Sequence, residues 1–398
     1  MNTETFRRFA NTRYQISHWA GVQKDAGRKK PQISAGTIFR DVVFGTVVGA
    51  RGVLQLDQRG RQKSFKALVG SSRDMVASDS TILRAASAWD LERARMANYA
   101  ACIQLRNEGL GHVRLSTGRK VRLAVVDGHE AGKHGMSVLG FAGAVKFQAV
   151  DLEPSEGRGH ELVTSRALLM RAAEKLGLGF ATHVGYDGLM ADRIDLAFIC
   201  KGLKSHLVVK TCEENSLEII QSSKQVWSKL SKAQLKRCGV EIIEGLDEQR
   251  GLTYEVYAQG GIMWKGLELP LKLAWVREKH LKGKYKGQTF EFWVITTDES
   301  LKAAELREIA HLRWRIETNA FKELNEQMGS KRAYIKDAHA KQALMLMGFL
   351  GMTLQQAFAL FLETLEEWHA LTVRKTKRVV AYVVEFGIGE VSPTSIPP

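Results

Sequence analysis

Cysteine is scarce in this chain, and the few cysteines present are not spaced as metal ligands. The four residues, Cys102, Cys200, Cys212 and Cys238, form no Cys-x2-Cys pair. That spacing argues against a structural zinc site and is typical of reduced thiols in a cytosolic protein. The chain also lacks a charged-then-apolar leader at its start, so we do not expect secretion.

Acidic residues are in deficit. The chain has 58 Lys and Arg against 43 Asp and Glu, which gives a formal net charge of +15. Residues 1–115 alone hold 19 Lys and Arg against 9 Asp and Glu, an excess of 10 positive charges. A basic excess of this size indicates a polyanionic partner, either nucleic acid or an anionic membrane surface. Its concentration in the first third favours a DNA-contacting N-terminal region over a uniformly solvated basic surface.

Charge is missing altogether from residues 343–362, a stretch about as long as one membrane span. However, Gln355 and Gln356 lie within it beside Thr353, and two glycines interrupt it. We therefore predict a buried core helix. A protein of anionic membrane surfaces is the alternative.

The first part of the chain has helical signals. At 398 residues the chain can bury a large core and form several domains, and residues 1–112 are expected to be a helical, basic DNA-binding region. A Gly- and Arg-rich connector should end near Gly60, and Ser78, Asp79 or Ser80 can cap the helix that follows. Two short helices joined by a turn would suit a helix-turn-helix DNA contact; a plain helical packing domain is the alternative.

The middle of the chain mixes strands and helices. The segment from Val113 to Val126 predicts a pair of strands, and the segment from Glu161 to Leu176 predicts an amphipathic helix. A short strand should then end at Asp187, so the order predicts a mixed α/β sheet. The expected divisions are 113–202 for the first part of the core, 203–300 for a β-rich insertion, 301–372 for the catalytic helix and the C-terminal helical part, and 373–398 for a basic and then flexible tail.

Three acidic residues suggest a site. Asp127 and Asp187 each follow an apolar run and precede glycine, which predicts that both lie at strand ends. Arg313 and Glu317 are four residues apart in a helix-like stretch, so both should project from one helical face. Carboxylates that gather two divalent cations serve phosphoryl transfer, and magnesium prefers oxygen ligands. The set predicts metal-dependent chemistry on DNA, against the simpler alternatives of Asp-Gly turns and a surface ion pair.

Three short motifs carry a family resemblance. They are Ala124-Val-Val-Asp127-Gly, Gly185-Tyr-Asp187-Gly-Leu and Arg313-Trp-Arg-Ile-Glu317, the last followed by Phe321-Lys-Glu-Leu324. Together they resemble the first-aspartate, second-aspartate and C-terminal motifs of DDE transposases of bacterial insertion sequences, in particular the insertion-sequence-four type. The resemblance spans roughly residues 35–365, and only these motifs within it are specific.

The resemblance implies an RNase H-like catalytic core with a β-rich insertion. Asp127, Asp187 and Glu317 would be the catalytic residues and would bind two Mg²⁺ ions, for which Mn²⁺ should substitute. Arg313 would contact a phosphate of the transposon end. The partners would be double-stranded DNA, at the transposon ends and at the target, and a second copy of the chain in a homodimeric DNA complex. The expected location is the cytoplasm, at the nucleoid when bound to DNA.

The resemblance is incomplete at two positions. The tyrosine of the C-terminal motif, three residues before Arg313, is replaced by Ala310, and the lysine is replaced by Leu324, or by Asn325 if one residue is inserted. Lys322 or Lys331 could serve as the phosphate clamp instead. These changes motivate the alternative of a catalytically silent, transposase-derived DNA-binding protein.

Aromatic and histidine side chains are further candidates. Trp264, Trp275 and Trp293 could stack on an unpaired or flipped base, or could belong to an ordinary sheet core. His129 and His134 follow Asp127 and could touch metal-bound water or DNA, although loop residues are the preferred interpretation.

Overall fold

A computed structural model gives the fold of the chain. It describes residues 3–70, 76–131, 134–144, 147–155, 161–188, 193–212, 217–322, 325 and 335–363. The chain divides into two compact units, each assembled from separate stretches of sequence. Unit 1 comprises residues 1–111, 128–158 and 316–398, and unit 2 comprises residues 112–127 and 159–315. The domain boundaries expected from the sequence stay predictions.

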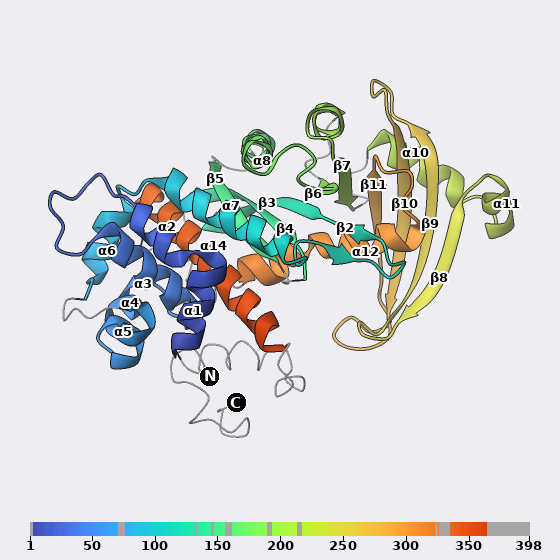
Figure 1. Ribbon diagram of the computed structural model, residues 1–398. Coiled ribbons are helices and arrows are strands. Elements are labelled where there is room, and N and C mark those ends of the chain that lie inside the picture. The colour runs from blue at the N-terminus through green and yellow to red at the C-terminus, as the bar shows by residue number, and fades with distance from the viewer. Residues whose placement is uncertain are drawn as a thin grey trace. The chain divides into compact units, whose positions relative to one another are not determined.

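Unit 1 is mainly helical, as predicted for the first part of the chain. Seven helices of the N-terminal stretch surround one long helix from the C-terminal stretch, which is coloured orange to red in Figure 1. The helices are α1 (Thr3–Tyr14), α2 (Ile16–Val22), α3 (Ala35–Val47), α4 (Val53–Gly60), α5 (Lys63–Val69), α6 (Asp79–Ala86), α7 (Leu91–Asn107) and α14 (Ala338–Glu363), with a π-helical segment at Ile316–Phe321.

Helix α14 is the core of unit 1. It packs against α3, α7 and strand β5 (Gln148–Ser155), and 83 % of the most apolar stretch of the helix is buried inside the fold. By length and composition it could cross a membrane, but its polar side chains are bound within the unit. The Nε2 atom of Gln355 donates to the carbonyl of Val47 at 2.8 Å. The prediction of a buried core helix is therefore confirmed.

The local signals in the N-terminal stretch give one confirmation and one correction. Ser78 is the N-cap of α6, and its hydroxyl accepts a hydrogen bond from the amide of Thr81. The connector expected to end near Gly60 is instead helix α4, which buries Val53 and Leu56. Burial of that short apolar face outweighs the weak helix propensity of its flanking glycines.

A β-hairpin completes unit 1. Strands β4 (His134–Ala142) and β5 pair antiparallel, with Val138 opposite Leu152. Asp151 is fully buried in β5, where it accepts hydrogen bonds from Arg95 Nε and from the Tyr99 hydroxyl, both at 2.9 Å. Both donors come from α7, so this buried carboxylate fixes the helix to the hairpin.

Unit 2 contains a large mixed sheet. Its strands follow the order β3-β6-β7-β11-β10-β9-β8, in which β3, β6 and β7 are parallel and the remaining pairs are antiparallel. Parallel strands need crossover connections, and helix α9 (Arg193–Ala197) lies in the connection between β6 and β7. The sheet strands are β3 (Leu123–Ala131, which enters unit 1 at Gly128), β6 (His183–Asp187), β7 (His206–Thr211), β8 (Glu241–Asp247), β9 (Leu252–Met263), β10 (Pro270–His280) and β11 (Thr289–Thr296).

The segment expected to be a β-rich insertion, residues 203–300, continues this sheet and does not form a sheet of its own. Its first strand, β7, pairs with β6, and β11 pairs with β7. The two remaining strands of unit 2, β1 (Val113–Arg114) and β2 (Lys120–Val121), form the predicted hairpin. Gly118 makes its turn with a φ of +86°, a conformation that favours glycine.

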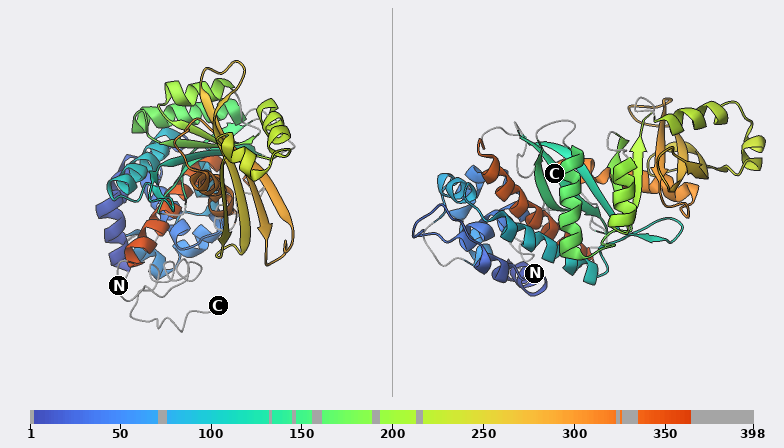
Figure 2. Two further views of the ribbon diagram at one scale, coloured as in Figure 1. Left: turned by 90° about the vertical axis from the view of Figure 1, so that its right-hand side faces the viewer. Right: turned by 90° about the horizontal axis from the view of Figure 1, so that it is seen from above.

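Helices cover both faces of the parallel part of this sheet. Helix α8 (Glu161–Leu176), at the predicted bounds, and α12 (Ala303–Arg313) lie on opposite faces (Figures 1 and 2). The other helices of the unit are α9 (Arg193–Ala197), α10 (Glu218–Trp227) and α11 (Lys232–Arg237), with a π-helical segment at Phe198–Gly202.

Buried charges hold α12 against the sheet. Glu278 of β10 accepts hydrogen bonds at 2.7 Å from Arg307 and from His311, which lie one helical turn apart. Burial would raise the pKa of Glu278, but the hydrogen bond and charge of His311 and the charge of Arg307 outweigh it and lower that pKa. The end of α12 is therefore held at a fixed position on the sheet, which matters for Arg313, the last residue of the helix.

Candidate functional site

The two aspartates predicted as ligands lie on neighbouring parallel strands of unit 2. Strands β3 and β6 pair Leu123 with His183 and Val125 with Gly185, and the same spacing of 60 residues relates Asp127 to Asp187. Residues that face each other across a sheet lie on the same face, so the register brings the two carboxylates side by side.

The strand-end prediction is confirmed for one aspartate only. Strand β6 ends at Asp187, whereas β3 continues past Asp127 to Ala131. Asp127 therefore lies in the middle of its strand, just beyond the residues that pair with β6. The reason is that β3 is longer than its parallel neighbour: the Asp127-Gly128 pair, expected to be a turn or a strand end, is extended backbone.

Arg313 bridges the two aspartates. One terminal guanidinium nitrogen lies 3.2 Å from Asp127 Oδ2, and the other lies 3.6 Å from Asp187 Oδ1. The Arg313 side chain is only 5 % exposed, whereas the side chains of Asp127 and Asp187 are 17 % and 44 % exposed. A Cβ at Gly185 would lie 3.5 Å from Arg313 Cγ, an ordinary contact distance, so the stem of the arginine passes next to β6 at this residue. The single positive charge of the guanidinium offsets part of the negative charge of the carboxylate pair at close range.

The helix that carries Arg313 stops there. Helix α12 ends at Arg313, Trp314 is its C-cap, and a π-helical segment begins at Ile316. The prediction that Arg313 and Glu317 share one face of a continuous α-helix is therefore wrong. The wider π-helical turn and the cap at Trp314 change the residue spacing between the two positions. Such interruptions recur at functional sites.

Glu317 belongs to unit 1, and its side chain is exposed. The same π-helical segment buries Ile316, Ala320 and Phe321. The Phe321 ring stacks on the imidazole of His129 at a centroid distance of 4.5 Å. One face of the segment thus packs inward, and the acidic residue points to solvent.

The remaining candidates of this region have mixed outcomes. Lys322 is described and exposed, whereas Lys331 and Leu324 lie outside the described residues. The expectation that His129 and His134 are loop residues is wrong, since they lie in β3 and β4. His129 is buried in β3, which continues past Asp127 to Ala131.

A lysine that the sequence reasoning missed lies beside the aspartates. Strands β6 and β7 pair Asp187 with Lys210, so Lys210 continues the row of charged residues across the parallel strands. Its ammonium nitrogen lies 3.0 Å from the ring centroid of Trp314 and 3.9 Å from that of Phe292. A signal was available: Lys210 follows the apolar run Leu207-Val-Val, as each aspartate follows its own run.

Two of the three candidate tryptophans lie inside the sheet of unit 2. Trp275 and Trp293 are opposite each other on β10 and β11, with parallel rings 5.7 Å apart, and both are buried. Trp227 of α10 packs on Trp293 with its ring tilted by 30° and the centroids 5.4 Å apart. In this conformation Trp275 and Trp293 act as core, which leaves Trp264 as the tryptophan of the three that a base could reach.

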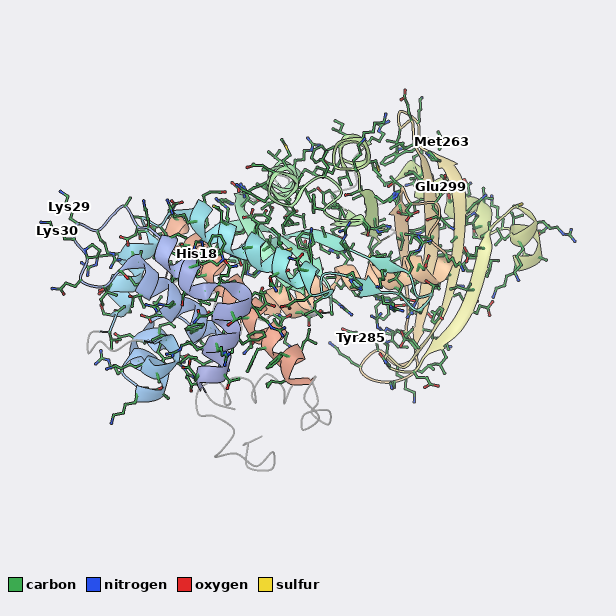
Figure 3. All side chains as sticks on the ribbon, in the orientation of Figure 1. His18, Lys29, Lys30, Met263, Tyr285 and Glu299 are labelled. Carbon is green, nitrogen blue, oxygen red and sulfur yellow. The ribbon has the colours of Figure 1, made fainter. Side chains whose placement is uncertain are left out.

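Trp264 lines a cavity of about 390 Å³ between α10 and the end of β9. Met263, labelled in Figure 3 at that end of the sheet, is 62 % exposed and lines it too. The guanidinium of Arg193 lies 5.7 Å from the Trp264 ring centroid. An open, partly aromatic cavity with a cation at its rim can accept a planar, electron-rich group.

The donor set at the aspartates is suited to a hard divalent cation, since carboxylate oxygens are the ligands that Mg²⁺ prefers. Within the described residues of either unit, no three His, Cys, Asp or Glu side chains gather as a metal site would require. The pair therefore supplies two ligands, and Arg313 supplies the positive charge beside them in this conformation.

No protein-family model and no curated protein sequence matches the chain. Among solved structures, the chain is similar to piggyBac transposase in a synaptic complex with hairpin DNA. The TM-score is 0.40 at 11 % identity, over 100 % of this chain and 85 % of the other. At that TM-score the likeness carries no weight for the function of this chain.

Proposed function

We propose that this protein is a DDE-type transposase, of the kind found in bacterial insertion sequences, that cuts DNA at the ends of a transposable element and joins them to target DNA. The observation that carries the proposal is the register of β3 and β6, which brings Asp127 and Asp187 together on one sheet face. Two acids side by side on neighbouring parallel strands, one of them at its strand's carboxyl end, are a suitable scaffold for phosphoryl transfer. The large mixed sheet of unit 2 is consistent with an RNase H-like core.

The chemistry assigned to the aspartates is cation binding. Bound Mg²⁺, or Mn²⁺ in its place, supplies positive charge at the reacting phosphate. Asp127 and Asp187 would hold the cations, and Glu317, by the motif resemblance, would be the third ligand. In the reaction, water or a 3′ hydroxyl attacks phosphorus, the bond to the leaving 3′ oxygen breaks, and the attacking group loses its proton to solvent.

Arg313 has a second task in this proposal. Once cations balance the aspartates, its guanidinium is available to donate two parallel hydrogen bonds to a phosphate of the transposon end. Lys322 and Lys331 are the further phosphate contacts expected from the sequence. Trp264 is the base-stacking candidate that its partial exposure supports. We place the reaction in the cytoplasm and expect a homodimer in the DNA complex.

The basic N-terminal stretch supports a DNA partner. Lys29 and Lys30 are exposed in the loop between α2 and α3 and project outward in Figure 3. Such lysines contribute to sequence-independent attraction of a phosphate backbone.

A second candidate is a catalytically silent DNA-binding protein derived from such a transposase. The observation that favours it is the ion pairing of Arg313 with both aspartates, which occupies one oxygen of each carboxylate. The replaced motif positions Ala310 and Leu324 point the same way. This candidate predicts tight, salt-sensitive DNA binding without metal-dependent cutting.

Strand cleavage tests the two candidates. A labelled duplex that carries the inverted repeats flanking the gene is incubated with Mg²⁺ or Mn²⁺ and with wild type, Asp127→Asn, Asp187→Asn or Glu317→Gln. The variant Asp57→Asn, of a carboxylate in α4 that pairs with Arg61, is the matched control. Nicking at the repeat boundary that requires metal and all three acids supports the transposase. Retardation of the duplex without any nick supports the silent binder, and cutting that survives all three substitutions contradicts the catalytic assignment.

A further inference from the structure

Lys210 is a buried cation next to the candidate site. It is paired in register with Asp187, and Asp187 lies beside Asp127, so three charged side chains cross β3, β6 and β7 on one sheet face. Lys210 is 4 % exposed, and a lysine is seldom buried to that extent. Arg313 and Trp314, at the end of α12, lie over this same row.

The cover over Lys210 is an aromatic side chain that faces solvent. Trp314 is 42 % exposed, yet the Lys210 ammonium lies 3.0 Å from its ring centroid. On the other side the ammonium lies 3.9 Å from the centroid of the buried Phe292 ring. The faces of aromatic rings attract a cation, so the pair of rings holds the ammonium of Lys210 in place. A rotation of Trp314 alone would open the ammonium to solvent.

We propose that Lys210 is a phosphate-positioning residue, and that Trp314 is the movable cover of its ammonium. When a DNA phosphate enters beside Asp187, the indole moves aside and the ammonium exchanges a ring face for a phosphate oxygen. A phosphate oxygen brings a full negative charge to the ammonium, whereas a ring face offers only its quadrupole, and this difference gives the exchange its direction. Arg313 and Trp314 are consecutive, so the indole would rotate beside the guanidinium that bridges the two aspartates.

This inference rests on the proposed function, since it needs a phosphate beside the aspartates. A phosphate-positioning role for Lys210 and a purely structural role predict different results. A structural lysine contributes to folding, whereas a lysine that contacts a phosphate contributes to the salt dependence of DNA binding. Each phosphate contact changes the slope of log affinity against log salt concentration by about 0.9.

The test is the affinity for a short fluorescent duplex by anisotropy, from low to high KCl, with Ca²⁺ in place of Mg²⁺ so that the duplex stays uncut. The variants are Lys210→Met, which keeps the length of the side chain, and Lys210→Arg, which keeps the charge. Lys232→Met is the matched control, because Lys232 is already paired with Glu244 and Glu255. We expect Lys210→Met to lower the slope by about 1, Lys210→Arg to retain most of it, and the control to leave it unchanged.

A second variant keeps the inference testable if Lys210→Met does not fold. Trp314→Ala removes the cover, so the duplex should bind about threefold or more tightly when Lys210 is present, with Trp314→Phe close to wild type. A Trp314→Ala protein that binds no tighter, or a folded Lys210→Met protein with the wild-type slope, overturns the inference. If cutting requires metal but Lys210→Met leaves the salt slope unchanged, the inference is wrong and the proposed transposase activity stands. If Lys210→Met lowers the slope but no cutting occurs, the inference stands and the proposed activity is wrong.

Discussion

The bridge that Arg313 makes between two carboxylates can be broken by one substitution of nearly equal length. Arg313→Met removes the charge and keeps an unbranched side chain that can still lie along Gly185. In the variant, Asp127 and Asp187 face each other on adjacent strands without the guanidinium between them. Like charges at such spacing repel, and Asp127 is mostly withdrawn from water.

The size of the effect follows from the burial of the three groups. Removal of one partner from a buried ion pair costs about 3–5 kcal/mol. Arg313 is 5 % exposed, but Asp187 is 44 % exposed and is screened by water. The loss of unfolding free energy should therefore be smaller than for a fully buried pair. We expect unfolding free energy to fall by about 2 kcal/mol without divalent cations. For a protein unit of this size that corresponds to roughly 4–8 °C in melting temperature.

Divalent cations should reverse the loss. The guanidinium and the cation compete for the same oxygens, so the variant should bind Mg²⁺ about tenfold or more tightly than wild type. At a hundredfold excess over the dissociation constant, a ligand that binds only the folded state adds about 2.7 kcal/mol. Thermal unfolding in EDTA and then in rising MgCl2 measures both quantities in one series.

A surface arginine provides the matched control. Arg61 pairs with Asp57 at 3.0 Å, but its side chain is 73 % exposed, so Arg61→Met should change stability by no more than about 0.5 kcal/mol. The reasoning is refuted if Arg313→Met melts in EDTA at the wild-type temperature. It is equally refuted if MgCl2 stabilises both proteins by the same amount.

Three further predictions concern stability. Burial raises the pKa of Asp41 to about 7, although the charge of Arg40 opposes the shift. The folded protein therefore loses stability as pH rises from 3.8 to about 7, so Asp41→Asn should melt above wild type at pH 8 and at the same temperature as wild type at pH 4. A difference in melting temperature that is constant across pH would be inconsistent with this. Burial would raise the pKa of Asp298, but hydrogen bonds from His183 and Ser300 hold it well below 3.8. The stability that Asp298 contributes is thus present above pH 3.8 and lost below it, so Asp298→Asn should flatten the acid limb of a stability–pH curve, and an unchanged limb would count against it. A Cβ at Gly188 would lie 2.5 Å from Thr211 Cβ and 3.0 Å from Thr211 Cα, so Gly188→Ala should lower the melting temperature by several degrees. Gly118→Ser is the comparison, because a Cβ there meets open space and only the turn is strained. Equal melting temperatures for Gly188→Ala and wild type would contradict the prediction.

Local signals in the sequence were sufficient for several elements. The helix over Glu161–Leu176, the cap at Ser78 and the hairpin turn at Gly118 were predictable because each depends on neighbouring residues only. The aspartates were found for the same reason, since each stands directly after an apolar run. Nothing in those runs states which strands pair.

Long-range pairing accounts for what the sequence did not reveal. Lys210 was missed because its position beside Asp187 is set by the register of β6 and β7, and not by a motif. The break after Arg313 was missed because Trp314 and Ile316 are compatible with a continuous helix, and the π-helical turn depends on packing of Ile316 and Phe321. The sequence predicted that residues 203–300 form strands. It did not predict that these strands join the same sheet as β3 and β6, because strand pairing joins residues that are not neighbours in the chain.

The place of α14 in the chain bears on synthesis. Helices α1 to α7 leave the ribosome first, while the helix on which α3 and α7 pack begins only at Ala338. Translation at about 5–20 residues per second then leaves the apolar faces of α3, including Phe39 and Val43, uncovered for tens of seconds. The nascent protein should therefore be a substrate for chaperones through most of its elongation, and a ribosome that stalls before Ala338 should release a product prone to aggregation and degradation.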